Sequence, residues 1–139
     1  MKKITVAICV DDNGGMLLFG KRLSRDRALI DDLLSSAAGK NVYITPFSKN
    51  LFDGREGIAI FDDPISMMGD GDIFFAENIS LLSNIDVIAE LVVYRWNRRY
   101  PSDYKMDIAP EENGFSLCDS YDFVGNSHDK ITKDIYRRV

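Results

Sequence analysis

The chain has 139 residues, of which 45% are hydrophobic and 28% are charged, and its formal net charge at pH 7 is −5. This length and composition predict a single domain over residues 1–139 with a substantial hydrophobic core. The acidic balance argues against a nucleic-acid binder, and the single histidine, His128, nearly excludes zinc sites built from several histidines. No apolar run is long enough to span a membrane and the start resembles no signal peptide, so we expect a cytoplasmic protein.

The segment from Ile4 to Val10 organises the predicted fold. It is mostly apolar, rich in β-branched residues and free of alternation, which is typical of a strand buried on both faces at the centre of a sheet. The residues Asp11 to Gly15 then predict a turn, which we favour over a phosphate-binding loop because no glycine-rich phosphate motif is present. In open α/β sheets, ligands bind at the edge where such strands end.

Helices and further strands follow in alternation. Leu17 to Arg22 is predicted to be a loop, and Ser24 is predicted to cap a helix from Arg25 to about Ala38, with its apolar residues on one face. Strands are predicted at 42–44, 57–61, 72–76, 91–96, 115–123 and 130–136; short helices are predicted from Ser48 to Phe52, at 65–68 and at 77–83; and 98–107 is expected to be irregular.

This order predicts an α/β fold: a mostly parallel central sheet flanked by helices, with an antiparallel C-terminal hairpin. Cys9 and Cys118 both lie in apolar strand-like runs, so we expect them to be reduced and buried. The string Gly69-Asp70-Gly71-Asp72 lacks the ligand spacing of a calcium loop and predicts a turn.

Several local strings recur in the order known from one enzyme family. They are Val10-Asp11 with Gly15-Met16, Leu23-Ser24-Arg25-Asp26, Ser102-Asp103-Tyr104, and Asn126-Ser127-His128 followed by 134–138. Together this set resembles the dihydrofolate reductase family over the whole chain. The resemblance implies a dihydrofolate reductase-like fold with Asp26 in the place of the catalytic carboxylate, and with Ile8, Asp26 and Tyr94 in substrate-binding positions.

The same resemblance implies that the cofactor loops are altered. The family's phosphate-binding Gly-Arg-x-Thr string is Thr45-Pro46-Phe47-Ser48 here, so proline replaces the arginine and only Ser48 keeps a hydroxyl. The family's consecutive glycines after the fourth strand are replaced by Ala76-Glu77-Asn78, which places a carboxylate toward the phosphates. The segment between Phe61 and Asp72 is also shorter than the family's. We therefore expect no NADPH and no other cofactor.

Three candidate features each have two interpretations. Asp26 is either a carboxylate that binds a pterin-like ring, with its pKa raised by burial, or an acid in the first turn of a helix. His128 is either a proton shuttle or a hairpin residue bonded to the backbone. The cluster from Arg95 to Tyr100 is either a nucleic-acid surface or, as is more common on an acidic protein, a solvated strand end or a protein contact.

Three functions follow from these observations. The first is an NADPH-dependent reductase of a pterin-like substrate, and the third is an RNA-binding module. We favour the second, a divergent dihydrofolate reductase-like protein that binds a small ligand or a protein partner without hydride transfer. The sequence is compatible with a homodimer and predicts no membrane partner.

Overall fold

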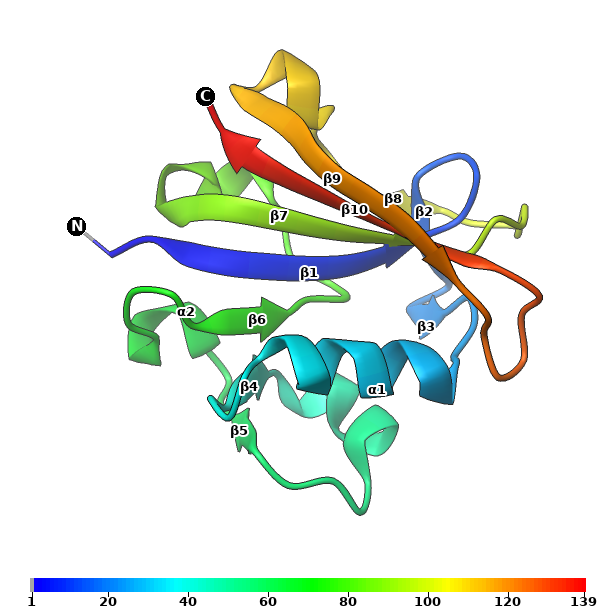
Figure 1. Cartoon of the computed structure of the whole chain (residues 1–139), viewed down its shortest axis with the longest axis horizontal. Coiled ribbons are helices and arrows are strands. Elements are labelled where there is room, and N and C mark those ends of the chain that lie inside the picture. Colours follow the sequence, from blue (N-terminus) through cyan, green and yellow to red (C-terminus); the bar gives the residue numbers. More distant parts are fainter. Residues whose placement is uncertain (1) are drawn as a thin grey trace.

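The computed structural model describes residues 2–139, and its centre is a seven-stranded sheet (Figure 1). The strand order is β5-β4-β6-β1-β7-β10-β9. Five strands run parallel: β1 (Ile4–Val10), β4 (Val42–Ile44), β5 (Ile58–Ile60), β6 (Ile73–Phe75) and β7 (Ile88–Arg95). The last two, β9 (Phe115–Phe123) and β10 (Ile131–Arg138), are antiparallel to each other, and β10 is antiparallel to β7. The predicted α/β class is confirmed.

Strand β1 occupies the interior of the sheet, as its unbroken apolar run predicted. It lies between β6 and β7 and has hydrophobic side chains on both faces. Ile4, Val6, Ile8 and Val10 belong to the core on one face, whereas Ala7 belongs to the core under α1, with Cys9 packed against it. Successive side chains of a strand point to opposite faces, so these two cores are separated by the sheet.

Helix α1 (Arg27–Ser36) is shorter than predicted and has a different cap. The N-cap is Asp26, not Ser24, because the Asp26 carboxylate accepts the backbone N–H of Ala28. The predicted apolar face is confirmed and packs on the sheet through Leu29, Ile30, Leu33 and Ala37.

The segment predicted as a loop at 17–22 instead contributes to a small second sheet. Its strands are β2 (Gly15–Leu18), β3 (Lys21–Arg22) and β8 (Tyr104–Lys105), in the order β3-β2-β8. Phe19 and Gly20 both have positive φ, 50° and 74°, which fits a tight two-residue hairpin turn. Strands this short leave almost no periodic signal in a sequence, which explains both this error and the irregular segment predicted at 98–107.

The helix predicted at 77–83 is also wrong. Residues 77–80 are irregular, and a 3₁₀ helix, η2, runs from Leu82 to Val87. Asp107, far along the chain, accepts hydrogen bonds from the backbone N–H groups of Leu81 and Leu82 and from the Ser80 hydroxyl. These contacts fix the segment in its place across the sheet face. The remaining short helices are η1 (Pro46–Phe52), which begins at Pro46 instead of Ser48, α2 (Pro64–Met67) and η3 (Pro110–Glu112).

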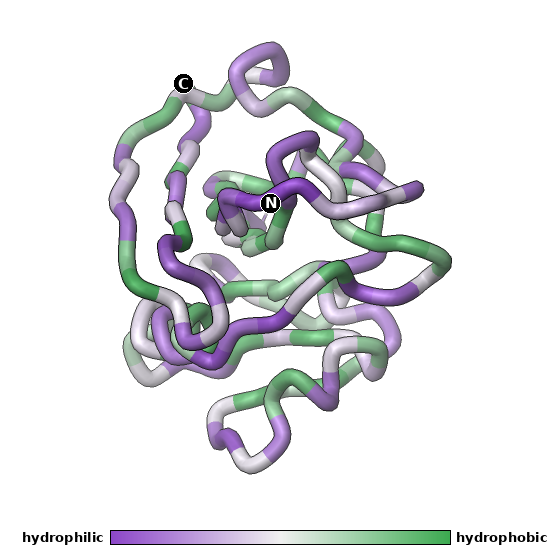
Figure 2. The backbone as a smooth tube through the Cα atoms, turned by 90° about the vertical axis from the view of Figure 1, so that its right-hand side faces the viewer, coloured by the Kyte–Doolittle hydropathy of each residue, from purple (hydrophilic) through white to green (hydrophobic). Residues whose placement is uncertain are grey.

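Strand β9 forms one edge of the large sheet and is mostly exposed. Figure 2 shows mixed hydrophilic and hydrophobic colouring along the two C-terminal strands. Both cysteines are free; Cys9 is partly buried, but Cys118, on β9, is exposed, so the prediction that it is buried was wrong. Among residues 2–139, no helix is long and apolar enough to cross a membrane.

Candidate functional site

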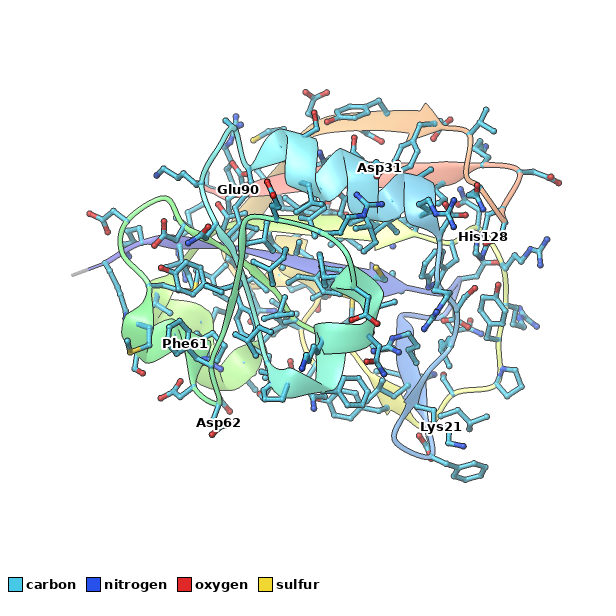
Figure 3. All side chains as sticks on the ribbon, turned by 90° about the horizontal axis from the view of Figure 1, so that it is seen from below. Lys21, Asp31, Phe61, Asp62, Glu90 and His128 are labelled. Atoms are coloured by element: carbon cyan, nitrogen blue, oxygen red, sulfur yellow. The ribbon has the colours of Figure 1, made fainter. Side chains whose placement is uncertain are left out.

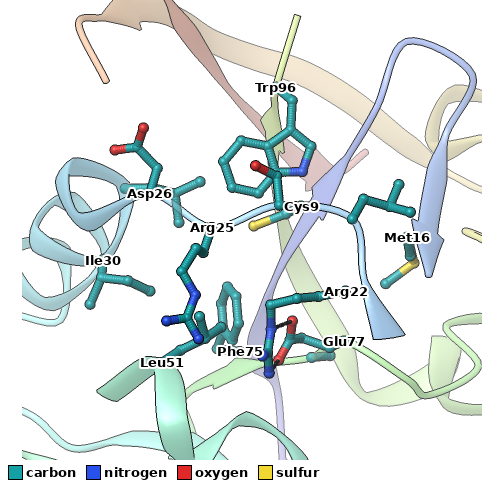
Figure 4. A pocket seen from close by; sticks show the side chains of 14 residues that line it. Cys9, Met16, Arg22, Arg25, Asp26, Ile30, Leu51, Phe75, Glu77 and Trp96 are labelled. Carbon is teal, nitrogen blue, oxygen red and sulfur yellow. Dashed lines mark hydrogen bonds and ion pairs between the residues drawn. The ribbon is translucent and has the colours of Figure 1, made fainter. Parts of the chain in front are cut away.

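A pocket lies where the carboxyl ends of β6, β1 and β7 meet the start of α1 (Figure 4). Its free volume is about 20 Å³, which is room for one or two water molecules. A larger groove of about 400 Å³ shares four of its lining residues and runs past the N-terminus of α1. The pocket is lined by Cys9, Met16, Arg22, Leu23, Ser24, Arg25, Asp26, Leu29, Ile30, Leu51, Phe75, Ala76, Glu77 and Trp96.

The Asp26 carboxylate is turned away from the pocket that its residue borders (Figure 4). Its side chain is fully buried. It accepts backbone N–H bonds from Ala28 at 2.9 Å, Asn126 at 2.7 Å and Ser127 at 2.8 Å. The carboxylate thus ties the start of α1 to the turn between β9 and β10. Asp26 is the N-cap of α1 and therefore precedes the first turn of the helix. Leu29 and Ile30 are the residues of the helix itself that line the pocket.

Of the two interpretations of Asp26, the structure does not favour the one in which burial raises its pKa. Burial by itself would raise this pKa, but the hydrogen bonds from Asn126, His128 and Ser127 outweigh burial and hold it well below its usual range. The carboxylate is therefore ionised at neutral pH and serves as an acceptor only.

His128 joins the same cluster from the β9–β10 turn. Its side chain is 2% exposed, and its ring stacks on Trp96 with the ring centroids 4.6 Å apart. Nδ1 lies 2.9 Å from Asp26 Oδ2, while Nε2 lies 3.0 Å from Ser24 Oγ and 3.1 Å from the Tyr100 hydroxyl. Figure 3 shows His128 at the same end of the molecule as Lys21, with Phe61 and Asp62 toward the other end. The imidazole is thus held by hydrogen bonds at both nitrogens.

A second polar cluster, formed by Arg22, Ser48 and Glu77, lies on the other side of the pocket. Arg22 donates from Nε and Nη2 to the two oxygens of Glu77, at 2.9 and 3.0 Å, and Ser48 Oγ donates to Glu77 Oε1 at 2.7 Å. The Arg22 and Glu77 side chains are 19% and 10% exposed, so solvent screens this pair only weakly. The Glu77 carboxylate therefore accepts hydrogen bonds from both neighbours.

The comparisons with known proteins bear on the fold. No protein-family model matches the chain, and no curated protein matches it significantly. Among solved structures, dihydrofolate reductase from Enterococcus faecalis, complexed with NADP(H) and RAB-propyl, matches with a TM-score of 0.68 over 98% of this chain and 96% of that chain. The chain has a dihydrofolate reductase-like fold. The sequence identity is 10%, so the likeness extends to the fold alone.

Within this dihydrofolate reductase-like fold, two of the expected substrate residues do not line the pocket. Ile8 is fully buried in the core on the far face of the sheet, so it points away from α1. Tyr94 lies on the α1 side, but it is fully buried and donates its hydroxyl to Asp32 at 2.6 Å. Asp26 is the one expected substrate residue that borders the pocket.

The pocket residues that sequence reasoning missed are the alternate neighbours of those residues. Cys9 follows Ile8 and faces α1, and Trp96 lies two residues after Tyr94, just past the end of β7, in the same core under α1. The period of two in a strand would have pointed to both, had the burial of each face been known. Burial, with a smaller contribution from Glu77, raises the pKa of the Cys9 thiol well above its usual value, so this thiol stays protonated.

The cluster from Arg95 to Tyr100 is not one open surface. Arg95 Nε donates to Asp134 at 2.7 Å, and its Nη2 donates to the Tyr136 hydroxyl at 3.0 Å. Trp96 is 4% exposed beneath His128. The second aromatic residue, Tyr100, is only partly exposed, and its hydroxyl lies 3.1 Å from His128 Nε2. Neither aromatic side chain is therefore fully exposed as a stacking platform of the kind that nucleic-acid surfaces use.

Proposed function

We propose that this chain binds a small anionic molecule at the start of α1 and carries out no NADPH-dependent reduction. The absence of NADPH-dependent reduction is supported by the cluster of Arg22, Ser48 and Glu77. Ser48 is the residue that would have kept a phosphate-binding hydroxyl, yet that hydroxyl donates to Glu77. A diphosphate placed there would meet a carboxylate and would have to displace it from Arg22.

Two further features support the loss of reduction. Pro46 begins η1 where the resemblance calls for an arginine, so this position offers neither charge nor an N–H donor. The Asp26 carboxylate, which would have to contact the substrate ring, is engaged by backbone N–H groups and His128. The residues present therefore do not suit NADPH.

The anionic ligand is inferred from the groove beside the pocket. A volume of about 400 Å³ falls in the range of small-molecule sites. Three arginines line it, and of these Arg55 pairs with Asp31 at 2.6 Å. Among the described residues, Arg25 and Arg27 form no ion pair, and both are exposed. Two free guanidinium groups on one groove favour a carboxylate or phosphate group.

A thermal-unfolding screen tests both the binding of anions and the absence of NADPH binding. Pyrophosphate and citrate are expected to raise the melting temperature more than sodium chloride of equal ionic strength, because ligands that bind only the native state stabilise it. The double variant Arg25→Ala/Arg27→Ala should lose this effect. The matched variant Arg98→Ala/Arg99→Ala, which removes two exposed arginines outside the groove, should keep it.

The alternative is an active reductase, favoured by a fold likeness that covers 98% of the chain. It requires that NADPH itself raise the melting temperature. A ligand at 100 times its dissociation constant stabilises the native state by about 2.7 kcal/mol, a shift of several degrees in a domain of this size. Such a shift with NADPH would overturn the proposal, as would equal effects of the anions and sodium chloride.

A further inference from the structure

The cluster around His128 contains an arrangement of side chains that the binding of an anion in the groove does not require. A serine, a histidine and an aspartate are joined in series: Ser24 Oγ lies 3.0 Å from His128 Nε2, and His128 Nδ1 lies 2.9 Å from Asp26 Oδ2. A nucleophile within hydrogen-bond reach of a base, itself oriented by a third group, is the geometry of nucleophilic catalysis. We propose that Ser24 is a nucleophile, that His128 is its general base, and that the chain hydrolyses small esters.

The hydrogen bonds of Asp26 decide which nitrogen of His128 carries the proton. The carboxylate is ionised and already accepts three backbone N–H bonds. It can only accept, so Nδ1 must be the protonated nitrogen that donates to it. In the neutral ring, Nε2 then carries the lone pair, and this lone pair faces Ser24. Asp26 is thus a positioning residue that fixes both the tautomer and the orientation of the ring.

Two contacts hold the His128 ring in place. The Asp26 carboxylate lies on one side of it, and the Trp96 ring stacks on its face at 4.6 Å. These contacts keep the imidazole in the orientation in which Nε2 faces Ser24.

Ser24 is accessible, whereas its two partners are not. It is partly exposed and lines the pocket, and the side chains of Asp26 and His128 are 0% and 2% exposed. The next residue, Arg25, extends its side chain into the same pocket (Figure 4). The pocket itself is too small for an acyl group, so a small ester would meet the partly exposed Ser24 from the solvent side. The positive charge of the adjacent Arg25 favours the negative charge that develops on the carbonyl oxygen.

The reaction balances with water as the only co-reactant. Ser24 Oγ attacks the ester carbonyl carbon as its proton passes to His128 Nε2, and the leaving alkoxide departs with that proton. Water then attacks the acyl-serine, and His128 again accepts the proton. This step releases the acid and returns the proton to Ser24 Oγ, which restores its hydroxyl. Asp26 stays ionised throughout.

The Tyr100 hydroxyl is the competing donor, because it lies 3.1 Å from the same Nε2. One lone pair accepts one strong hydrogen bond, so Tyr100 and Ser24 share it. The variant Tyr100→Phe removes the competitor. Because Ser24 then has the lone pair of Nε2 to itself, it should react faster than in the wild-type chain.

A fluorophosphonate probe tests the proposal without knowledge of the natural substrate. Attack by Ser24 forms an oxygen–phosphorus bond and releases fluoride, and the serine proton passes to His128. Peptide mapping by mass spectrometry should find the adduct on Ser24 in the wild-type chain. Removal of the base in His128→Gln should slow labelling by about 100-fold or more, the usual contribution of a general base. The control variant Ser83→Ala removes an exposed serine outside the cluster and should label Ser24 normally.

Hydrolysis of p-nitrophenyl acetate gives a second readout. Ser24→Ala should remove the hydrolysis that exceeds the buffer rate. Because Ser24 is partly exposed, we expect this variant to fold as the wild-type chain does, and a thermal melt checks this. If His128→Gln fails to fold, the wild-type map and Ser24→Ala decide the question. No adduct on Ser24, an adduct spread over surface serines, or equal rates in His128→Gln would overturn the proposal. None of these outcomes depends on whether the groove binds anions.

Discussion

At the scale of single residues, Gly125 shows how closely the β9–β10 turn approaches α1. A Cβ at this position would lie 2.6 Å from Asp26 Oδ2 and 2.6 Å from the His128 carbonyl oxygen. We therefore expect Gly125→Ala to lower the free energy of unfolding by about 1–3 kcal/mol, because the added atom has no room in a packed region. Chemical denaturation measures this change.

The control for this prediction is Gly69→Ala. The nearest atom to a Cβ there is Asp72 Oδ2 at 3.8 Å, an ordinary contact, and the backbone of Gly69 has no positive φ. This variant should be as stable as the wild-type chain within about 0.5 kcal/mol. Equal stability of Gly125→Ala would mean that the turn stands further from α1 than the hydrogen bonds to Asp26 indicate.

At the scale of elements, Glu77 joins three segments at the pocket. It follows β6, and it is bonded to Arg22 of β3 and to Ser48 of η1. Glu77→Gln removes the charge and leaves Arg22 without a counter-ion in a place where solvent screens poorly. We expect a loss of about 2–4 kcal/mol in the free energy of unfolding, measured by chemical denaturation.

The matched control for Glu77→Gln is Glu90→Gln. Glu90 also pairs with an arginine, Arg137, but these side chains are 27% and 59% exposed. A surface pair of this kind contributes about 0–1 kcal/mol, so the control should be nearly neutral. If both variants lose the same stability, Glu77 holds Arg22 and Ser48 no more strongly than a surface pair would. The proposal that Glu77 excludes a diphosphate then loses its support.

The elements also show which patterns in the sequence carry information. Helix α1 was predicted because Leu29, Ile30 and Leu33 repeat at helical spacing, and these residues are buried as expected. The helix predicted at 77–83 has apolar residues as well, but Asp107 takes its backbone N–H groups. A local pattern predicts an element when its partners are local, and it fails when a residue from a distant segment satisfies the backbone.

At the scale of the whole molecule, the fold was largely predictable and the site was not. The apolar run of β1 and the alternation of strands and helices indicated a mostly parallel sheet with an antiparallel C-terminal hairpin, as the structure has, but not the order of its strands. The partners of Asp26 were hidden, because Asn126, Ser127 and His128 lie about 100 positions further along the chain. Sequence reasoning found the acid and placed it at the start of a helix, but only the folded chain shows which groups its oxygens contact.

Three aspartates that each accept several hydrogen bonds determine how the stability of the whole molecule depends on pH. Burial by itself would raise the pKa of Asp11, Asp26 and Asp107, but their hydrogen bonds outweigh it and hold each pKa below its ordinary value. In the unfolded chain an aspartate titrates at about 3.9, so below this pH the unfolded state binds more protons than the native state. Their stabilisation is therefore fully present well above pH 4 and is lost as the pH falls further.

We expect the free energy of unfolding, measured by urea denaturation, to fall steeply between pH 5 and pH 3. Each aspartate contributes at most about 1.4 kcal/mol per pH unit to that slope. Asp26→Asn should be less stable at pH 7, because an amide cannot accept all of these bonds, and its profile should be flatter by one group. Asp129→Asn, an exposed residue next to His128, should keep the wild-type slope. A wild-type profile that stays level down to pH 3 would contradict the prediction, since it would mean that these carboxylates are as easily protonated in the native state as in the unfolded chain.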